Sequence, residues 1–225
     1  MKTLIFSDTH FSAEFEPARY RAIIRLIKSV DRVIINGDFW DSYLTTFDNF
    51  INSEWQRLFP LLKEKQTVYI YGNHDRPNDC DLRVGLFSTQ QAADYILETK
   101  KQTFLIEHGH VLAKEFEESH PAITKCLKGI YPWLDAQTQG VGLVGLLYQQ
   151  YHEYRHHRLW QKMLHKLANN PNWLTSHKQL LVGHCHHQMN DAKLRIQSLG
   201  SFRWGFGRYA IIDQKSFKIF ETRYS

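Results

Sequence analysis

The stretch Gly72-Asn73-His74-Asp75 follows a short apolar, β-rich segment at residues 67–71. Such a segment predicts a strand, and the four residues after it predict a turn at the carboxyl end of that strand. In open α/β sheets the binding site lies along this edge. Asn offers a neutral carbonyl oxygen to a metal, His moves protons near neutral pH, and Asp can orient that His. The tetrapeptide therefore predicts a ligand, Asn73, beside a proton-transfer pair, His74 and Asp75.

The residues before this stretch predict a βαβ unit. Residues 4–6 and 32–36 are short apolar strands, and residues 16–29 between them have helical periodicity. A strand, a helix and a strand of this length give parallel strands joined by a right-handed crossover. Residues 47–65 predict another helix, in which Pro60 marks a kink or a boundary.

Ligand-type side chains follow both of these early strands. In extended backbone, residues i and i+2 point to the same face, so Asp8 and His10 can meet one ion. The alternative interpretation is a helix N-cap Asp beside a surface His. Asp38 ends the neighbouring strand, where its carboxylate can bridge two ions. We expect Asp41 to orient a ligand histidine rather than to bind metal itself.

Two more apolar runs end in histidines. His108 follows the first run directly, His110 is the alternative ligand there, and a surface turn is the alternative interpretation of the pair. His184 and His186 follow the second run and again lie two residues apart. Three histidines in four positions are hard to explain by packing, so we expect metal binding there and a buried Cys185.

Together the strand ends supply seven nitrogen and oxygen ligands: Asp8, His10, Asp38, Asn73, His108, His184 and His186. Seven ligands with one shared carboxylate fit two ions rather than one. Imidazole and carboxylate without thiolate favour Mn²⁺, Fe or Zn²⁺ over Mg²⁺ or Ca²⁺, and we expect Mn²⁺ first. Two such ions, about 3.5 to 4 Å apart, can activate a bridging water and clamp a phosphoryl oxygen.

The composition predicts a soluble globular chain. Its 225 residues suit a single domain over residues 1–225, and the formal charge of +5 mildly favours anionic partners. Cys80, Cys126 and Cys185 show no CxxC pair and no disulfide framework, which indicates free thiols in a reducing compartment. No signal-peptide or membrane-spanning pattern occurs, so we expect a cytoplasmic location.

Residues 111–178 differ from the rest of the chain in composition and periodicity. They are rich in Trp, Tyr and His and carry helical periodicity interrupted by prolines, which predicts a mostly helical insertion. Its basic character comes from Lys125, Lys128 and the run Arg155-His156-His157-Arg158. A cap packed on the core is the first interpretation; a substrate lid or a peripheral membrane contact is the alternative. Short segments within residues 194–221 predict a second, more antiparallel sheet.

The order of these motifs resembles the calcineurin-like metallophosphoesterase family. The matching blocks are DxH at residues 8–10, GDxxD at 37–41, GNHD at 72–75, HGH at 108–110 and GHxH at 183–186. They cover residues 1–110 and 179–225 and leave the insertion unassigned. The resemblance implies an α/β fold, a four-layer αββα sandwich, and a phosphohydrolase whose nucleophile is a metal-bridging hydroxide.

Family roles transfer onto the matching residues. They imply one ion held by Asp8, His10, Asp38 and His186, and a second held by Asp38, Asn73, His108 and His184. His74 would be the general acid or a phosphate contact, paired with Asp75. Residues 198–201 are similar to the Gly-Ser segment that closes the family's core near its site.

A general phosphohydrolase of small or lipid-linked substrates is the first interpretation. Two more specific enzymes and a non-catalytic scaffold are the alternatives. The helical insertion is similar to the acyl lid of UDP-2,3-diacylglucosamine pyrophosphatases, although His74 replaces their Arg and His110 their acidic residue. A nuclease or phosphodiesterase fits the pI of about 9.0, but no long basic run or aromatic-basic platform supports nucleic-acid binding. A non-catalytic scaffold is disfavoured because no ligand is missing. The oligomeric state does not follow from the sequence.

Overall fold

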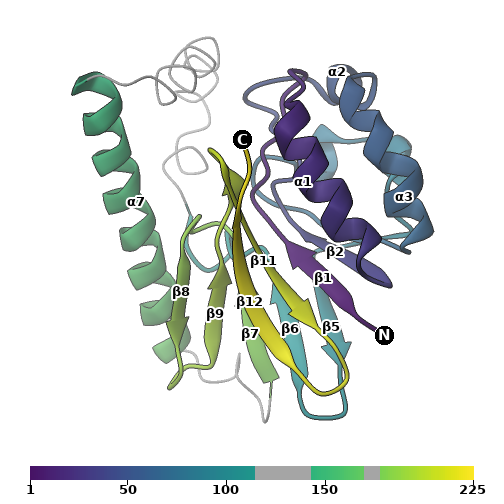
Figure 1. The fold of residues 1–225 in the computed structure, drawn as a ribbon. Helices are drawn as coiled ribbons and strands as arrows, with labels where there is room; N and C mark the ends of the chain where they lie inside the picture. The colour runs from purple at the N-terminus through teal and green to yellow at the C-terminus, as the bar shows by residue number, and fades with distance from the viewer. Residues whose placement is uncertain (115–142, 170–177) are drawn as a thin grey trace.

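The computed structural model describes residues 1–114, 143–169 and 178–225, and within the second range the side chains from residue 154 onward (Figure 1). Its helices are α1 (Pro17–Lys28), α2 (Phe47–Ile51), α3 (Phe59–Glu64) and α7 (Leu143–Ala168), with short 3₁₀ helices at Glu54–Leu58, Pro77–Asp79 and Leu82–Leu86. Its strands are β1 (Thr3–Phe6), β2 (Arg32–Asn36), β3 (Val68–Ile70), β4 (Gln90–Ala92), β5 (Asp94–Glu98), β6 (Thr103–Glu107), β7 (Lys178–Val182), β8 (Gln188–Asp191), β9 (Ile196–Leu199), β10 (Phe202–Arg203), β11 (Phe206–Ile212) and β12 (Phe217–Arg223).

The first sheet grows from the predicted βαβ unit. Strands β1, β2, β3 and β4 run parallel in that order, and β11 joins β1 in the antiparallel direction. β11 also pairs with β12 along its whole length and with β10 at its start. The residues of β1 and β3 are buried throughout, as expected for parallel strands covered on both faces.

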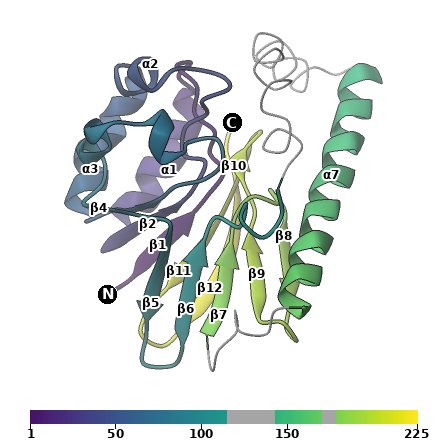
Figure 2. The same ribbon diagram turned by 180° about the vertical axis from the view of Figure 1, so that it is seen from behind.

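The second sheet has the order β5-β6-β7-β9-β8 (Figure 2). Its three central strands, β6, β7 and β9, are parallel, while the edge strands β5 and β8 are antiparallel. A second sheet is present as expected, but it is mixed rather than mostly antiparallel, and the C-terminal strands are divided between the two sheets. β9 and β8 extend this mixed sheet, and β11 and β12 extend the first one, because each strand buries its apolar face against a different neighbour.

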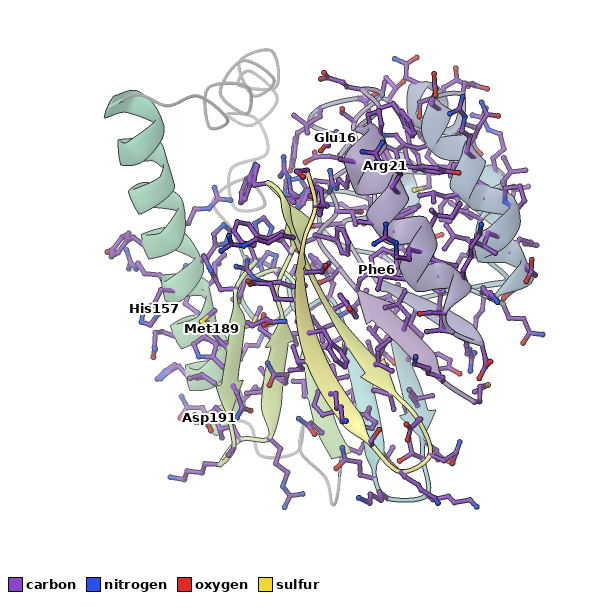
Figure 3. All side chains as sticks on the ribbon, in the orientation of Figure 1. Phe6, Glu16, Arg21, His157, Met189 and Asp191 are labelled. Carbon is purple, nitrogen blue, oxygen red and sulfur yellow. The ribbon has the colours of Figure 1, made fainter. Side chains whose placement is uncertain are left out.

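Three apolar clusters separate the layers of the described residues. Helices α1 and α3 pack Ile23 and Leu62 onto the outer face of the first sheet. Ile34 and Ile106 lie in the cluster between the two sheets. α7 covers the outer face of the second sheet with a cluster that includes Met163. Figure 3 shows this last arrangement from the side: Met189 lies between β8 and α7, whereas His157 points away from the sheet.

The helix expected over residues 47–65 is divided into three pieces. α2 ends at Ile51, and Ser53 then caps the 3₁₀ helix by accepting from the Trp55 N–H at 3.3 Å while donating to the Phe50 carbonyl at 2.6 Å. A serine that bonds the local backbone in this way competes with the helical ladder. Pro60 then lies in the first turn of α3, so it marks a helix start and not a kink.

The insertion is described only in part. α7 (Leu143–Ala168) lies within it, but residues 115–142 and 170–177 lie outside the described residues, so the mostly helical insertion stays a prediction. The predicted free thiol at Cys126 lies outside the described residues too, whereas Cys80 forms no disulfide and Cys185 is buried as expected. Of the helices that the structure describes, none has the length and apolarity that a membrane crossing requires.

Candidate metal centre

The seven side chains expected as ligands meet where β1, β2, β3, β6 and β7 end. Each has at most 7% of its surface exposed: Asp8, His10, Asp38, Asn73, His108, His184 and His186. Buried charges of this kind are expensive unless they are paired or bind a metal. Their convergence from five strand ends is the main structural fact about this protein.

The backbone reaches this arrangement by an unexpected route. Asp8, His10, Asp38, His184 and His186 all have positive φ angles, between 45° and 64°. The expectation that Asp8 and His10 share a face because the chain is extended is therefore wrong in its reason. Left-handed residues alternate with others and turn the chain tightly, and this turning brings the paired side chains together.

The loop after β7 shows how tight these turns are. The Cys185 N–H donates to the Gly183 carbonyl at 2.7 Å, and the His187 N–H donates to the Cys185 carbonyl at 2.7 Å. Each bond closes a three-residue turn with positive φ at its centre, first at His184 and then at His186. Such γ-turns are rare and strained, at about 1–3 kcal/mol for each sparsely populated residue. Strain that the surrounding structure maintains is typical of functional sites.

Two clusters of ligand atoms form around the carboxylates. In the first, His186 Nε2 lies 3.3 Å from Asp8 Oδ1 and 3.1 Å from His10 Nε2. In the second, His108 Nε2 lies 3.2 Å from Asp38 Oδ2 and 3.1 Å from Asn73 Oδ1. His184 joins this second group, and within each group the His and Asp ligand atoms lie within 4.8 Å of one another. Both groups consist of nitrogen and oxygen donors.

Hydrogen bonds fix which nitrogen of each ring faces the clusters. His108 Nδ1 donates to the Asn36 carbonyl at 2.9 Å, and His10 Nδ1 lies 2.9 Å from Asp41 Oδ2. In the neutral form of both rings the proton is thus held on Nδ1, so Nε2 is the nitrogen that would offer its lone pair to a metal. His184 is turned the other way, since its Nε2 donates to the Ala113 carbonyl at 2.7 Å and leaves Nδ1 as the ligand atom.

The charges of the metal-free site are mutually dependent. Burial penalises the charged form of His108, but the Asp38 carboxylate outweighs it and raises the pKa of His108 to about 10. Burial likewise opposes charge on Asp38, whose pKa nevertheless falls well below its usual range because His108 and His74 face it. Burial raises the pKa of Asp8, and the Asp38 charge adds to this. A divalent cation between the two carboxylates would relieve their repulsion.

His74 is paired with a different aspartate from the one expected. Its Nδ1 lies 3.0 Å from Asp41 Oδ1, so Asp41 holds both His10 and His74. Asp75 instead accepts three backbone N–H groups, those of Gly72, Asp38 and Phe39, at 2.7, 3.1 and 2.6 Å. The pairing of His74 with Asp75 is therefore wrong: Asp75 shapes the loops, and Asp41, which we expected to orient a ligand histidine, contacts both His10 and His74.

Two motif glycines are required by close approach. A Cβ at Gly72 would lie 2.1 Å from Asp38 Oδ1, and one at Gly183 would lie 2.6 Å from Asp8 Oδ2. Any side chain at either position would displace a ligand carboxylate. Gly72 of the GNHD block thus leaves room for Asp38 of the GDxxD block, and Gly183 of the GHxH block leaves room for Asp8 of the DxH block.

The choice between His108 and His110 is resolved by geometry. His108 points its Nε2 at Asp38 and Asn73, whereas the His110 ring lies beside it, 5.5 Å from the His108 ring and 6.4 Å from the His184 ring. Burial, together with the neighbouring His108 and His184, lowers the pKa of His110 to about 3. His110 is therefore a neutral neighbour of the second cluster.

Sequence reasoning missed the contribution of α7. His156 is 1% exposed, and its ring centroid lies 4.2 Å from that of His186 with 31° between the planes. Met163, two turns further on, lies 3.6 Å from the Cys185 sulfur. The only sequence feature that pointed to this contact was the run Arg155-His156-His157-Arg158. Its composition is that of a basic surface, and only the position of α7 in the fold shows that His156 is buried.

The segment at residues 198–201 does close the site, as its resemblance implied. The Ser201 N–H donates to the His186 carbonyl at 3.1 Å, and the Phe202 N–H donates to the Asp8 carbonyl at 3.3 Å. From the other side, the buried Arg19 guanidinium of α1 donates to the Thr9 carbonyl. The segment at Ser201–Phe202 thus holds both the DxH and the GHxH loops, and α1 adds a second support to the DxH loop.

Solved structures of similar fold share little sequence with this chain. Yfce, described as a phosphoesterase from E. coli, is 16% identical over all of both chains with a TM-score of 0.46. Wild-type Vps29 of Entamoeba histolytica, complexed with Zn²⁺, is 10% identical over 99% of both chains with a TM-score of 0.45. The nuclease MPE of Pseudomonas putida is 15% identical over 92% of this chain and 83% of its own, with a TM-score of 0.45.

Family membership comes from the sequence. No curated protein matches the chain. The pattern of the calcineurin-like phosphoesterases matches residues 1–200, which include all seven converging side chains. The two mixed sheets and the buried His and Asp clusters at their edge agree with that match. This chain therefore belongs to the calcineurin-like phosphoesterase family.

Proposed function

We propose that the protein is a dinuclear metal-dependent phosphohydrolase that cleaves phosphoester or pyrophosphate bonds. One ion would be held by Asp8, His10, Asp38 and His186, and the other by Asp38, Asn73, His108 and His184. All of these side chains are present, buried and close together. Mn²⁺ is the first candidate, with Fe or Zn²⁺ as alternatives, because the donors are imidazole, amide and carboxylate groups.

The position of the Asp38 carboxylate supports two ions rather than one. Its Oδ2 lies 3.6 Å from His10 Nε2 and 3.2 Å from His108 Nε2, so it faces both clusters. Its Oδ1 accepts the His74 N–H at 2.9 Å, which fixes the orientation of the group. A carboxylate held in this way can be shared by two cations. Two divalent cations against two aspartates leave net positive charge, which suits a phosphate anion.

His74 is the best-placed residue for proton transfer. When bound, the two ions would lower the pKa of coordinated water and neutralise charge on the phosphoryl group. His74 is 14% exposed at its side chain, so a substrate can reach it, while Asp41 holds its Nδ1. With Nδ1 held by Asp41, Nε2 is the nitrogen that would give a proton to the leaving oxygen. Asp41 stabilises the charged imidazole that this role needs.

The complete ligand set favours an enzyme over a scaffold that has lost catalysis. A lipid pyrophosphatase would depend on the part of the insertion outside the described residues, so the acyl-lid function stays an untested alternative. A phosphorylated small molecule is the substrate class that the site itself supports.

The test is hydrolysis of an aryl phosphomonoester and an aryl phosphodiester, with and without Mn²⁺, by the wild type and by Asp38→Ala. Metal content is measured on the same samples by mass spectrometry. Asp79→Asn is the matched control because Asp79 is an exposed aspartate in the loop after the GNHD block. We expect two metal equivalents and metal-dependent turnover in the wild type and the control.

Asp38→Ala should retain at most one ion and lose turnover, because its carboxylate faces both clusters. Substantial Mn²⁺-dependent activity in Asp38→Ala would contradict the shared-ligand assignment. Two bound ions without hydrolysis of any ester in the wild type would support the scaffold instead.

A further inference from the structure

The β10–β11 hairpin is attached to the metal centre along both of its strands. Just before β10, the Ser201 N–H donates to the His186 carbonyl at 3.1 Å. From β11, the Arg208 guanidinium donates to the same carbonyl at 3.3 Å. Two hydrogen bonds to the His186 carbonyl therefore fix the position of the hairpin tip relative to His186.

An exposed tryptophan lies at that tip. Arg203 pairs with Phe206, so the turn between the strands consists of only Trp204 and Gly205, with φ angles of 54° and 80°. Positive φ at both residues is typical of a type I′ turn, whose first position favours Asn, Asp or Gly. A bulky residue with positive φ is an outlier that costs conformational energy. Trp204 is nevertheless 40% exposed, so core packing does not explain it.

The indole ring has neighbours suited to a flat anionic ligand. Its centroid lies 6.3 Å from the His186 ring, with 65° between the planes. The Arg203 guanidinium carbon lies 4.8 Å from the indole centroid, over the ring. The hairpin thus presents a rigid aromatic surface and a positive charge next to the first cluster. Such pairs of an aromatic ring and Arg bind nucleobases by stacking.

We propose that Trp204 and Arg203 form a subsite that stacks the nucleobase of a substrate whose phosphate reaches the metal centre. The substrate class is then a phosphate ester of a nucleoside. This proposal rests on the phosphohydrolase function proposed above and specifies its substrate. Arg203 and Trp204 are adjacent in the sequence, but only folding places them beside His186.

The experiment compares esters that differ only in the base. Adenosine 5′-phosphate and ribose 5-phosphate form one pair, and their methyl esters form a second pair for an enzyme that prefers diesters. The variant is Trp204→Asn, because Asn removes the ring and suits the first position of a type I′ turn. Phe220→Thr is the control: Phe220 is also an aromatic residue with 38% exposure, but it lies on β12 and stacks on Tyr209.

In the wild type we expect kcat/KM to be higher for the nucleoside ester. Trp204→Asn should lower that value by about 5- to 150-fold, the effect of losing one base–aromatic stack, and bring it close to the value for the ribose ester. Equal kcat/KM values for both members of the pair, or a nucleoside preference that survives in Trp204→Asn, would overturn the subsite while leaving the hydrolase function intact.

A binding measurement covers the case in which no ester is cleaved. Adenosine 5′-phosphate should quench tryptophan fluorescence of the metal-loaded wild type and of Phe220→Thr, whereas ribose 5-phosphate should not. The quenching should disappear in Trp204→Asn. Quenching without turnover would refute the proposed hydrolase but support the subsite, and absence of quenching in the wild type would refute the subsite.

Discussion

Replacing Asp41 with Asn should weaken metal binding although Asp41 is not expected to be a ligand. Asp41 Oδ1 accepts the Tyr43 N–H at 2.8 Å and lies 3.0 Å from His74 Nδ1, while Oδ2 lies 2.9 Å from His10 Nδ1. An asparagine must keep its oxygen at the Tyr43 N–H. Its amide NH₂ group then faces His10 Nδ1.

This orientation forces His10 into the wrong tautomer. An NH₂ group can only donate, so His10 Nδ1 must become the acceptor and its proton must move to Nε2. A protonated Nε2 cannot bind a cation. The loss of such an orienting partner typically lowers metal affinity by about 10- to 100-fold, which equals roughly 1.4 to 2.7 kcal/mol. The His74 imidazolium also loses its negative partner, so turnover should stay reduced even with saturating metal.

Calorimetric titration of metal-free protein with Mn²⁺ measures the first effect, and kcat at saturating Mn²⁺ measures the second. His74→Ala separates the two, since it should lower kcat by about 10²- to 10⁴-fold with nearly unchanged metal affinity. Wild-type Mn²⁺ affinity in Asp41→Asn would refute the tautomer argument. A loss of ions in His74→Ala would show that His74 belongs to the ligand set.

Two further predictions concern α7 and pH. His156→Ala should weaken Mn²⁺ binding about tenfold because His186 loses the ring whose centroid lies 4.2 Å away. His156→Phe should restore most of the lost affinity, since it keeps an aromatic ring at that position. Equal losses of affinity in both variants would contradict a packing role. Metal binding must displace the proton of His108, whose pKa Asp38 raises to about 10, so affinity should rise about tenfold per pH unit from pH 7 to 9. Titrations at three pH values check this, and a flat profile would mean that His108 is already neutral.

Much of the site could be predicted from the sequence because its chemistry is carried by residue types at strand ends. Asp38 and Asn73 each follow a short apolar run, and parallel strands deliver their carboxyl ends to one edge. His108 and His184 come from the second sheet, which faces the first across a shared apolar core. Periodicity identifies such strands locally, so the side chains that converge in the structure could be named before their distances were known.

The contacts that orient these ligands could not be predicted in the same way. The partner of His74 depends on turn geometry: Asp75 adjoins His74 in the sequence, but Asp41 of the GDxxD block is the aspartate that contacts its ring. His156 reaches His186 from a helix whose position depends on Met163 and its apolar neighbours. The Asn36 and Ala113 carbonyls that set the tautomers have no side-chain signature at all. Long-range packing decides each of these cases.

The two consecutive γ-turns at residues 183–187 have a consequence for how the protein acquires metal. Because Met163 and His156 on one side and Ser201 on another hold this loop, its histidines are already in place before any ion arrives. Binding then requires removal of protons and water but little movement of the chain. The geometry of the loop, rather than the preferences of each incoming ion, sets the coordination angles, so the fold itself can discriminate among cations of similar charge.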